Sequence, residues 1–186
     1  GAVSASVDIQ QMAGRKLDVS SVSGNVVVTA SSPGEASFEN VSGDTTLRIT
    51  TNKLDAQAVS GDLHVSGGIT GEVSIETVSG NIEFAGKALD RLELNTVSGD
   101  ARTTFGLRQG GEVKAETLSG ELELNMPKAT GAKLHVETFS GDINSPVGRV
   151  DREEHGPGAK LEATMGDGRG RIELQSFSGD VRINLQ

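Results

Sequence analysis

Apolar and polar residues recur along this chain in a unit of about 20 residues. Each unit has an apolar residue directly before a Ser-Gly pair, and Asp, Asn or Glu directly after the pair. The glycines of these pairs are Gly24, Gly43, Gly61, Gly80, Gly99, Gly120, Gly141 and Gly179. Successive glycines are 18 to 21 residues apart, except for the last step of 38. A repeat of this length indicates a solenoid, in which one short unit stacks on the next.

Numbering each unit from its glycine separates the apolar positions into columns. Positions −7 and −5 are apolar in every unit, and they alternate with polar residues as a strand does. Position −2 is apolar too, and so is +2 in all units but one. Because the step from −5 to −2 is odd, we expect the chain to turn or bulge there, so that these columns share one core. The residues at −2 are Val22, Val41, Val59, Val78, Val97, Leu118, Phe139 and Phe177.

The Ser-Gly-Asp or Ser-Gly-Asn step predicts a corner, because glycine adopts positive φ and the polar side chains bond to nearby backbone. Each unit is then a strand, a corner, a second strand and a short return loop, such as 66–68 or 85–87. No segment of helical length carries the 3.6-residue period. The sequence predicts an all-β, single-stranded β-helix of about nine coils in one domain over residues 1–186. A degenerate coil with a long loop is expected at about 142–166, because the last step is doubled.

Position −8 carries charges that alternate in sign from unit to unit. These residues are Lys16, Glu35, Lys53, Glu72, Arg91, Glu112, Lys133 and, after the doubled step, Arg171. Stacked parallel coils lie about 4.8 Å apart, so equivalent side chains become direct neighbours. The alternation therefore predicts in-register stacking, which opposite charges favour and like charges would penalise.

Composition narrows the function classes. With 17 basic and 26 acidic residues the net charge is −9, which disfavours binding to nucleic acid and to an anionic membrane. The chain has no cysteine, so disulfides and thiolate metal sites are excluded. It begins Gly-Ala-Val-Ser without Met. We therefore expect an extracytoplasmic protein, secreted, periplasmic or tethered to the cell surface, in which a signal or anchor segment has been removed.

Three stretches carry a family resemblance: 76–81 (Glu-Thr-Val-Ser-Gly-Asn), 95–100 (Asn-Thr-Val-Ser-Gly-Asp), and the closing stretch 166–181. With these units the chain resembles a bacterial family of exported β-strand-repeat proteins, a domain of unknown function that carries the label of an adhesin. The resemblance covers most of the chain. It implies a right-handed, single-stranded β-helix outside the cytoplasmic membrane, with some members tied to envelope stress, and it brings no catalytic or ligand residues.

The residues that follow the corner glycines form the first candidate surface. They are Asn25, Asp44, Asp62, Asn81, Asp100, Glu121, Asp142 and Asp180. Oxygen-rich rows on a β-helix can bind Ca²⁺, which takes six to eight oxygen ligands. However, the nonapeptide spacing of calcium-binding β-rolls is missing, and each coil supplies one carboxylate. The favoured interpretation is that these side chains stabilise the corners by hydrogen bonds, and no metal or other cofactor is expected.

The second candidate surface is the long loop, with Asp151, Arg152, Glu153, Glu154 and His155. We expect it to be a solvated tip. A row of mainly threonine at position −3 could order water as ice-binding proteins do, but those proteins present two threonines per coil. Hydrogen bonds between coils are the favoured role of this row.

No catalytic constellation is apparent. His64, His135 and His155 fall in different columns and different coils, and only one loop is long enough to help build a polysaccharide-cleaving groove. The leading hypothesis is a non-enzymatic adhesin or cell-envelope binding or scaffold protein. Its partners would be a cell-surface glycan, an envelope protein or further copies of itself. The alternative is a bactofilin-like protein that polymerises end to end, since the last strand pattern, 181–186, has no capping helix.

Overall fold

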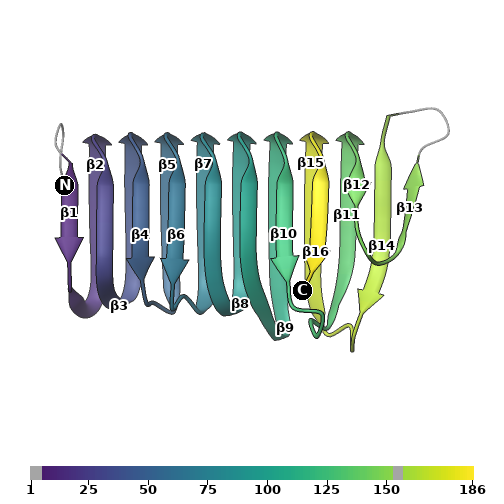
Figure 1. Ribbon diagram of the computed structural model, residues 1–186, viewed down its shortest axis with the longest axis horizontal. Helices are drawn as coiled ribbons and strands as arrows, with labels where there is room; N and C mark the ends of the chain where they lie inside the picture. The colour runs from purple at the N-terminus through teal and green to yellow at the C-terminus, as the bar shows by residue number, and fades with distance from the viewer. Residues whose placement is uncertain (1–5, 153–156) are drawn as a thin grey trace.

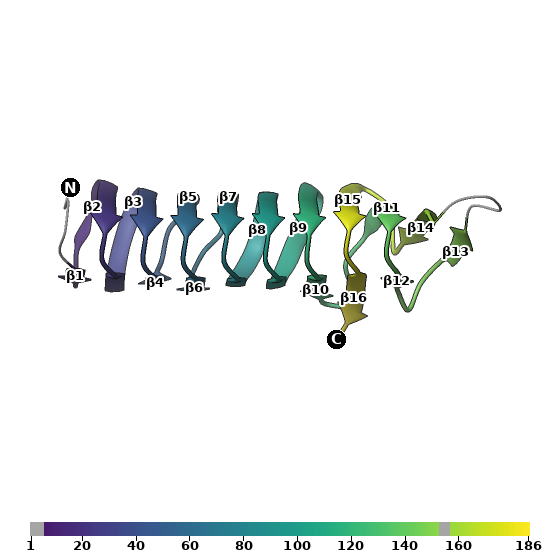
Figure 2. The same cartoon turned by 90° about the horizontal axis from the view of Figure 1, so that it is seen from above.

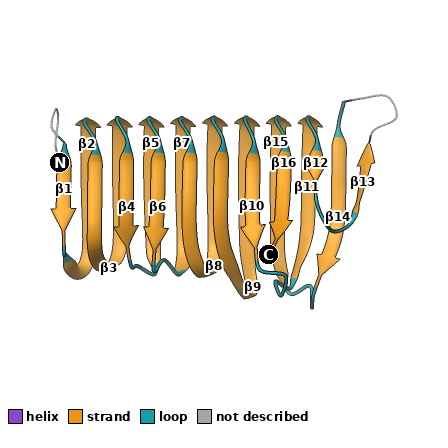
Figure 3. Cartoon of the chain, viewed as in Figure 1, coloured by secondary structure: helices purple, strands orange, loops and turns teal. Residues whose placement is uncertain are grey.

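The computed structural model describes residues 6–152 and 157–186, and within them the chain is all-β without helix (Figures 1 and 3). It forms a β-solenoid, which confirms the predicted fold class. The strands are β1 (Val7–Gln10), β2 (Ala13–Ser23), β3 (Val26–Ser42), β4 (Thr45–Ile49), β5 (Lys53–Ser60), β6 (Leu63–Gly67), β7 (Gly71–Ser79), β8 (Ile82–Ser98), β9 (Ala101–Ser119), β10 (Leu122–Met126), β11 (Ala132–Ser140), β12 (Ile143–Asn144), β13 (Arg149–Arg152), β14 (Ala159–Met165), β15 (Gly170–Ser178) and β16 (Val181–Leu185).

The strands lie in two layers that meet at the glycine corners (Figure 2). The entry layer holds the strands that lead into a corner, such as β5, β7, β15 and β11, and the exit layer holds those that leave it, such as β4, β6, β10 and β16. The long strands β3, β8 and β9 bend from the exit layer into the entry layer. The expected return loop at 85–87 is therefore wrong, because β8 runs through it as continuous strand.

Backbone hydrogen bonds tie each corner to the next. The corner glycine donates its N–H to the carbonyl of the serine in the neighbouring corner, for example Gly61 to Ser79 at 3.2 Å. Seven of the eight corner glycines have φ between 113° and 157°, a region that other residues rarely enter. A Cβ on Gly99 would also overlap the carbonyl oxygen of Gly80. The repeated glycine is thus required by both its dihedral angle and the closeness of the next coil.

A single apolar core fills the space between the two layers. Positions −7 and −5 of the entry layer are buried in every unit, as predicted, and so is +2 of the exit layer. The buried side chains stack in files along the axis, with Leu54 beside Val73 in one file and Ile75 beside Leu94 in the next. Burying each of these contributes about 1.5–3 kcal/mol before the entropy cost, so the core supplies the cohesion between coils.

The last coil of the chain is not the last coil in space. Strand β15 pairs in parallel with β9 on one side and β11 on the other, and β16 pairs with β10 and β12. The coil that ends the chain is therefore inserted between two coils that precede it, and the C-terminus lies within the row of strands (Figure 1). The chain winds about six turns up to Gly141 and then returns, which is fewer than the nine coils predicted.

The segment 142–166 does not form the degenerate coil that was expected. Its strand β14 pairs with β11 in antiparallel fashion, and β13 pairs with β14 in the same way. This antiparallel pair lies against the end of the solenoid, beyond β11 and β12 (Figure 1). The 38-residue step between Gly141 and Gly179 thus forms the antiparallel end cap and then leads the chain back to a coil inside the row.

The charge column at position −8 follows this spatial order. Lys53 faces Glu35 and Glu72, as predicted, and opposite charges alternate as far as Glu112. The next neighbour of Glu112 is Arg171 rather than Lys133. Lys133 consequently lies beside Arg171, a like charge, so the predicted alternation fails at this one place.

Candidate functional site

The residues directly after the glycines form one continuous row along the corner edge. In spatial order this corner row is Asn25, Asp44, Asp62, Asn81, Asp100, Glu121, Asp180 and Asp142. A side-chain oxygen in the row accepts a hydrogen bond from the backbone N–H of the adjacent row member. The donor–acceptor distance is 3.1 Å from Asp62 to Asp44, 2.8 Å from Asn81 to Asp62 and 2.8 Å from Asp142 to Asp180.

This row therefore has the hydrogen-bonding role expected from the sequence, with the difference that the bonds join neighbouring coils. Asp44, Asp62 and Asp100 each offer one carboxylate oxygen to the adjacent corner; Asp44 and Asp100 remain exposed, and Asp62 is half-buried. Within residues 6–152 and 157–186 no three acidic or histidine side chains gather as a metal site. The row lines the corner edge with negative charge.

The long loop meets the corner row at its end. Asp151 and Arg152 close strand β13, and Arg152 forms an ion pair with Asp142 of the row. Asp151 pairs with Arg149 at 3.7 Å. The structure thus joins the two surfaces that the sequence suggested separately. The other predicted loop residues, Glu153, Glu154 and His155, lie outside the described residues.

The apolar residues at position −2 point outward, which corrects their assignment to the core. Their side chains are 45–58% exposed and form a file along the entry layer beside the corners. We call this the apolar file; in spatial order it is Val22, Val41, Val59, Val78, Val97, Leu118, Phe177 and Phe139. Phe139 and Phe177 stack at its end, with ring centroids 5.0 Å apart. Exposed apolar rows of this length are typical of interaction surfaces, which makes the apolar file a candidate for one.

The alternation of the strand itself contained the signal for this outward orientation. Position −2 has the same parity as the polar positions −8, −6 and −4, so an unbroken strand places all four on its outer face. The residues at −3 then face inward, and they are only 3–6% exposed. The prediction failed because it gave the apolar character of −2 more weight than strand parity.

The buried row at −3 closes the inner side of the corners. Ser176 donates its hydroxyl to the carbonyl of Gly179 at 3.0 Å, and Asn40 donates its amide to Gly43 at 2.8 Å. Thr138 makes a longer bond, 3.4 Å, to Gly179 on the neighbouring coil. The expected bonding between coils is present for part of the row. Since these hydroxyls are buried, the ice-binding alternative is wrong.

A long groove of about 1080 Å³ runs beside the apolar file. One wall is the file, and the other is position −4, which is polar in every coil. The wall residues at −4 are Glu39, Gln57, Glu76, Asn95, Glu116, Gln175 and Glu137. The groove crosses the strands and reaches the first residues of β14, where Gly158 and Lys160 line its end. A groove lined by apolar residues with a few polar groups is the usual form of a binding site.

The charges along the groove are unevenly compensated. Lys114 pairs with Glu116 at 2.8 Å, and Lys160 pairs with Glu137 at 3.0 Å. The hydrogen bond from the Lys160 ammonium is the main reason that the pKa of Glu137 is lowered; His135 adds to this effect, and partial burial opposes it. Within the described residues, Glu39 and Glu76 have no such cation within ion-pair distance. The valine half of the groove therefore carries uncompensated negative charge.

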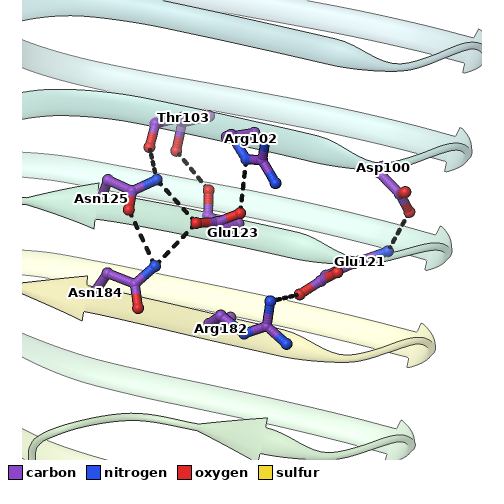
Figure 4. A network of polar contacts seen from close by, with 8 residues as sticks. All are labelled: Asp100, Arg102, Thr103, Glu121, Glu123, Asn125, Arg182 and Asn184. Atoms are coloured by element: carbon purple, nitrogen blue, oxygen red, sulfur yellow. Dashed lines mark hydrogen bonds and ion pairs between the residues drawn. The ribbon is translucent and has the colours of Figure 1, made fainter.

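A second polar cluster lies on the exit layer, where the inserted coil meets β10 (Figure 4). Glu123 accepts hydrogen bonds from Arg102 at 2.7 Å and from Asn184 at 2.9 Å. Its side chain is 15% exposed, and the hydrogen bond from Arg102 lowers its pKa against the opposing effect of burial. Beside it, Arg182 pairs with Glu121 at 2.7 Å. Because its members come from three adjacent coils, this cluster fastens the inserted coil and has a structural role.

His64 and His135, the two histidines in the described part of the chain, do not lie together. His64 lies 3.6 Å from Glu83 on the exit layer, whereas His135 lies 3.1 Å from Glu137 on the entry layer. Each of the two lies beside a carboxylate, and His135 is also 3.5 Å from Glu162. The groove on the entry layer, with its apolar and polar walls, is the candidate functional site.

The repeat, the two-layered stack and the inserted final coil together invite comparison with known families. The model of the Toastrack DUF4097 family, a domain of unknown function, matches residues 4–184. The chain belongs to this family. Comparison with curated proteins and with solved structures gave no match. The Toastrack assignment thus agrees with the resemblance seen in the repeat units, and it brings no ligand or activity with it.

Proposed function

We propose that this chain is a non-enzymatic, extracytoplasmic β-solenoid that acts as an adhesin-like or cell-envelope binding and scaffold protein. Its partner is a cell-surface glycan, an envelope protein or another copy of the chain. The observation that supports binding is the apolar file, whose eight side chains stay about half exposed and seven of which line a groove that crosses the entry layer. A protein with no partner would gain solubility by placing polar residues there, as it does at −4, −6 and −8.

The rigid backbone under the groove also supports a binding role. The entry strands are hydrogen-bonded to neighbours on both sides, for example β7 between β5 and β8. Such a surface changes little when a partner docks, which keeps the cost of ordering low.

Among the described residues there is no helix long and apolar enough to cross a membrane.

Binding of fluorescently labelled protein to isolated bacterial envelopes tests this proposal. A groove variant carries Val59→Thr, Val78→Thr and Val97→Thr, which keep the β-branched shape and remove apolar surface. A control variant carries Glu35→Gln, Lys53→Gln and Glu72→Gln, three changes on the same layer outside the groove. We expect the groove variant to bind at least tenfold more weakly and the control to bind as wild type does. Equal binding by all three proteins, or no binding by wild type, would overturn the proposal.

Two further measurements test the proposed lack of enzymatic activity and the proposed extracytoplasmic location. Incubation with a panel of bacterial polysaccharides is expected to release no new reducing ends. Protease treatment of intact cells and of spheroplasts that express the full natural protein is expected to digest this domain in at least one of the two preparations, whereas a cytoplasmic domain would remain protected in both.

The alternative of end-to-end polymerisation was based on an uncapped last strand, 181–186. Strand β16, at the end of the chain, is paired on both sides by β10 and β12 and is not a free edge. The end of the solenoid beyond β11 is covered by the antiparallel strands β14 and β13. Parallel head-to-tail stacking at that end would have to displace them.

A further inference from the structure

The groove is bordered by carboxylates on both sides. On one side lies position −4, with Glu39 and Glu76 uncompensated within the described residues. On the other side, past the Ser-Gly corner, lies the corner row, in which Asp44 and Asp100 are exposed and Asp62 is half-buried. An apolar stripe between two acidic borders is complementary to a partner that has an apolar stripe between two basic borders.

The direction of the groove selects the shape of this partner. The groove runs across the strands, and the backbone groups beneath it are already paired between coils. An extended peptide could not add to this sheet by backbone hydrogen bonds, because that requires a free strand edge. A helix satisfies its own backbone and needs only side-chain contacts. Its turns rise by about 5.4 Å, close to the spacing of about 4.8 Å between members of the apolar file.

A second copy of the chain fits this surface poorly. If two files pack with a two-fold axis along the file, position −4 of one copy faces the corner row of the other. With the axis across the file, like rows face each other. Both arrangements set carboxylates against carboxylates in a partly desolvated interface, which opposes association.

We propose that the groove binds a basic amphipathic α-helix of a partner protein, laid along the solenoid axis. This inference rests on the proposed function and names its partner class. The apolar face of the helix covers the valine file, and Lys or Arg on its two flanks meet position −4 and the corner row. Eight coils span about 34 Å, which corresponds to a helix of about 22 residues. The stacked Phe139 and Phe177 widen the file at one end and offer the largest apolar contact there.

The test uses a synthetic 22-residue helical peptide with Leu on one face and Lys on both flanks, labelled for fluorescence anisotropy. Two control peptides have the same composition in scrambled order, and Glu in place of every Lys. We expect the Lys helix to bind at least tenfold more tightly than either control. The variant Glu39→Gln, Glu76→Gln should weaken binding about three- to tenfold and reduce its salt dependence, whereas Glu35→Gln, Glu72→Gln outside the groove should not.

Three outcomes would overturn the inference. The first is equal binding of the Lys and Glu helices. The second is binding of the protein to neutral phosphatidylcholine vesicles that is lost in the Val59→Thr, Val78→Thr, Val97→Thr variant, which would identify a lipid surface instead. The third is dimerisation of wild type, measured by sedimentation, that the same variant abolishes. Envelope binding that depends on the valines but is not competed by the Lys helix would reject this inference and leave the proposed function standing.

Discussion

Phe139 stacks on Phe177, with ring centroids 5.0 Å apart and ring planes 5° from parallel, although they belong to coils on either side of the doubled repeat. In a simple solenoid the neighbour of Phe139 would be Leu118, one repeat earlier. Instead, Ser178 pairs with Ser119 on one side and with Ser140 on the other. The stacked rings thus mark the place where the final coil enters between two earlier ones.

Cysteine cross-linking provides a direct test of this coil order, because the natural chain has no cysteine. The pairs Ser119→Cys with Ser178→Cys and Ser140→Cys with Ser178→Cys join directly adjacent strands. We expect both to form disulfides under mild oxidation, as seen by mass spectrometry and by faster migration on non-reducing gels. The pair Ser119→Cys with Ser140→Cys should stay reduced, since these positions are two coils, or about 9.6 Å, apart and disulfides need less than about 7 Å between Cα atoms. Oxidation of this third pair alone would mean that the coils follow chain order.

Reversing one charge at position −8 should raise the stability of the protein at Lys133 and lower it at Lys53. Lys133 neighbours Arg171 and Thr164, so Lys133→Glu replaces a repulsive pair by an attractive one. We expect it to raise the free energy of unfolding by about 0.2–1 kcal/mol at low salt.

Lys53→Glu is the matched comparison for this change. It places three glutamates in succession, with Glu35 and Glu72 on either side, and should lower the free energy of unfolding by a similar amount. Urea unfolding at low and high salt measures both variants. A loss of stability in Lys133→Glu would contradict the position of Arg171 beside Lys133.

The corner glycines should tolerate no side chain. Gly99→Ala adds a Cβ that overlaps the carbonyl oxygen of Gly80, at a φ of 127°. We expect the free energy of unfolding to fall by about 2 kcal/mol or more from the dihedral strain and the displaced neighbouring coil. Gly110→Ala, with φ of 79° and open space around the added Cβ, isolates the dihedral effect and should cost about 1 kcal/mol. An equal effect at both positions in thermal unfolding would refute the close packing of the corners.

Glu123 should make stability depend on pH through the inserted coil. Its folded-state pKa is lowered, chiefly by the hydrogen bond from Arg102. A lowered pKa adds stability above the unfolded-state pKa of about 4.3, and this stability disappears as the pH falls through the folded-state value. Glu123→Gln should cost about 1 kcal/mol at pH 7 and show a shallower loss of stability between pH 7 and pH 3. Glu83→Gln, in the same column but 66% exposed, is the control and should cost less stability at pH 7 than Glu123→Gln.

The buried threonine row offers a stabilising substitution. The hydroxyl oxygens of Thr77 and Thr96 are buried and make no hydrogen bond within the described part of the chain. Replacing Thr77 by Val removes an unpaired polar group at nearly constant volume, and we expect the free energy of unfolding to rise by about 1 kcal/mol. Ser176→Ala, which removes a hydroxyl that bonds to Gly179, should lower it by about 1 kcal/mol. Chemical denaturation that ranks these two variants in the reverse order would contradict the assigned bonding.

The local pattern of the chain determined the parts of the structure that depend on near neighbours. The repeat length, the glycine corners, the buried columns such as Leu54 and Ile75, and the pairing of Lys53 with Glu72 all follow from spacing and parity, because each coil rests directly on the next. Strand parity also indicates that Val59 and its equivalents at position −2 point outward. That information was in the sequence, but the apolar character of position −2 obscured it.

Only the tertiary structure decided where the final coil lies and what covers the end of the solenoid. All coils share the same inward columns, so the pattern of β15 fits equally well beside β9 or beyond β11, and local spacing does not distinguish these positions. Long-range contacts make the choice: Arg171 against Glu112, Asn184 against Glu123, and the antiparallel pairing of β14 with β11. The groove arises in the same way, because its apolar file is continuous only when the coils are stacked in their spatial order.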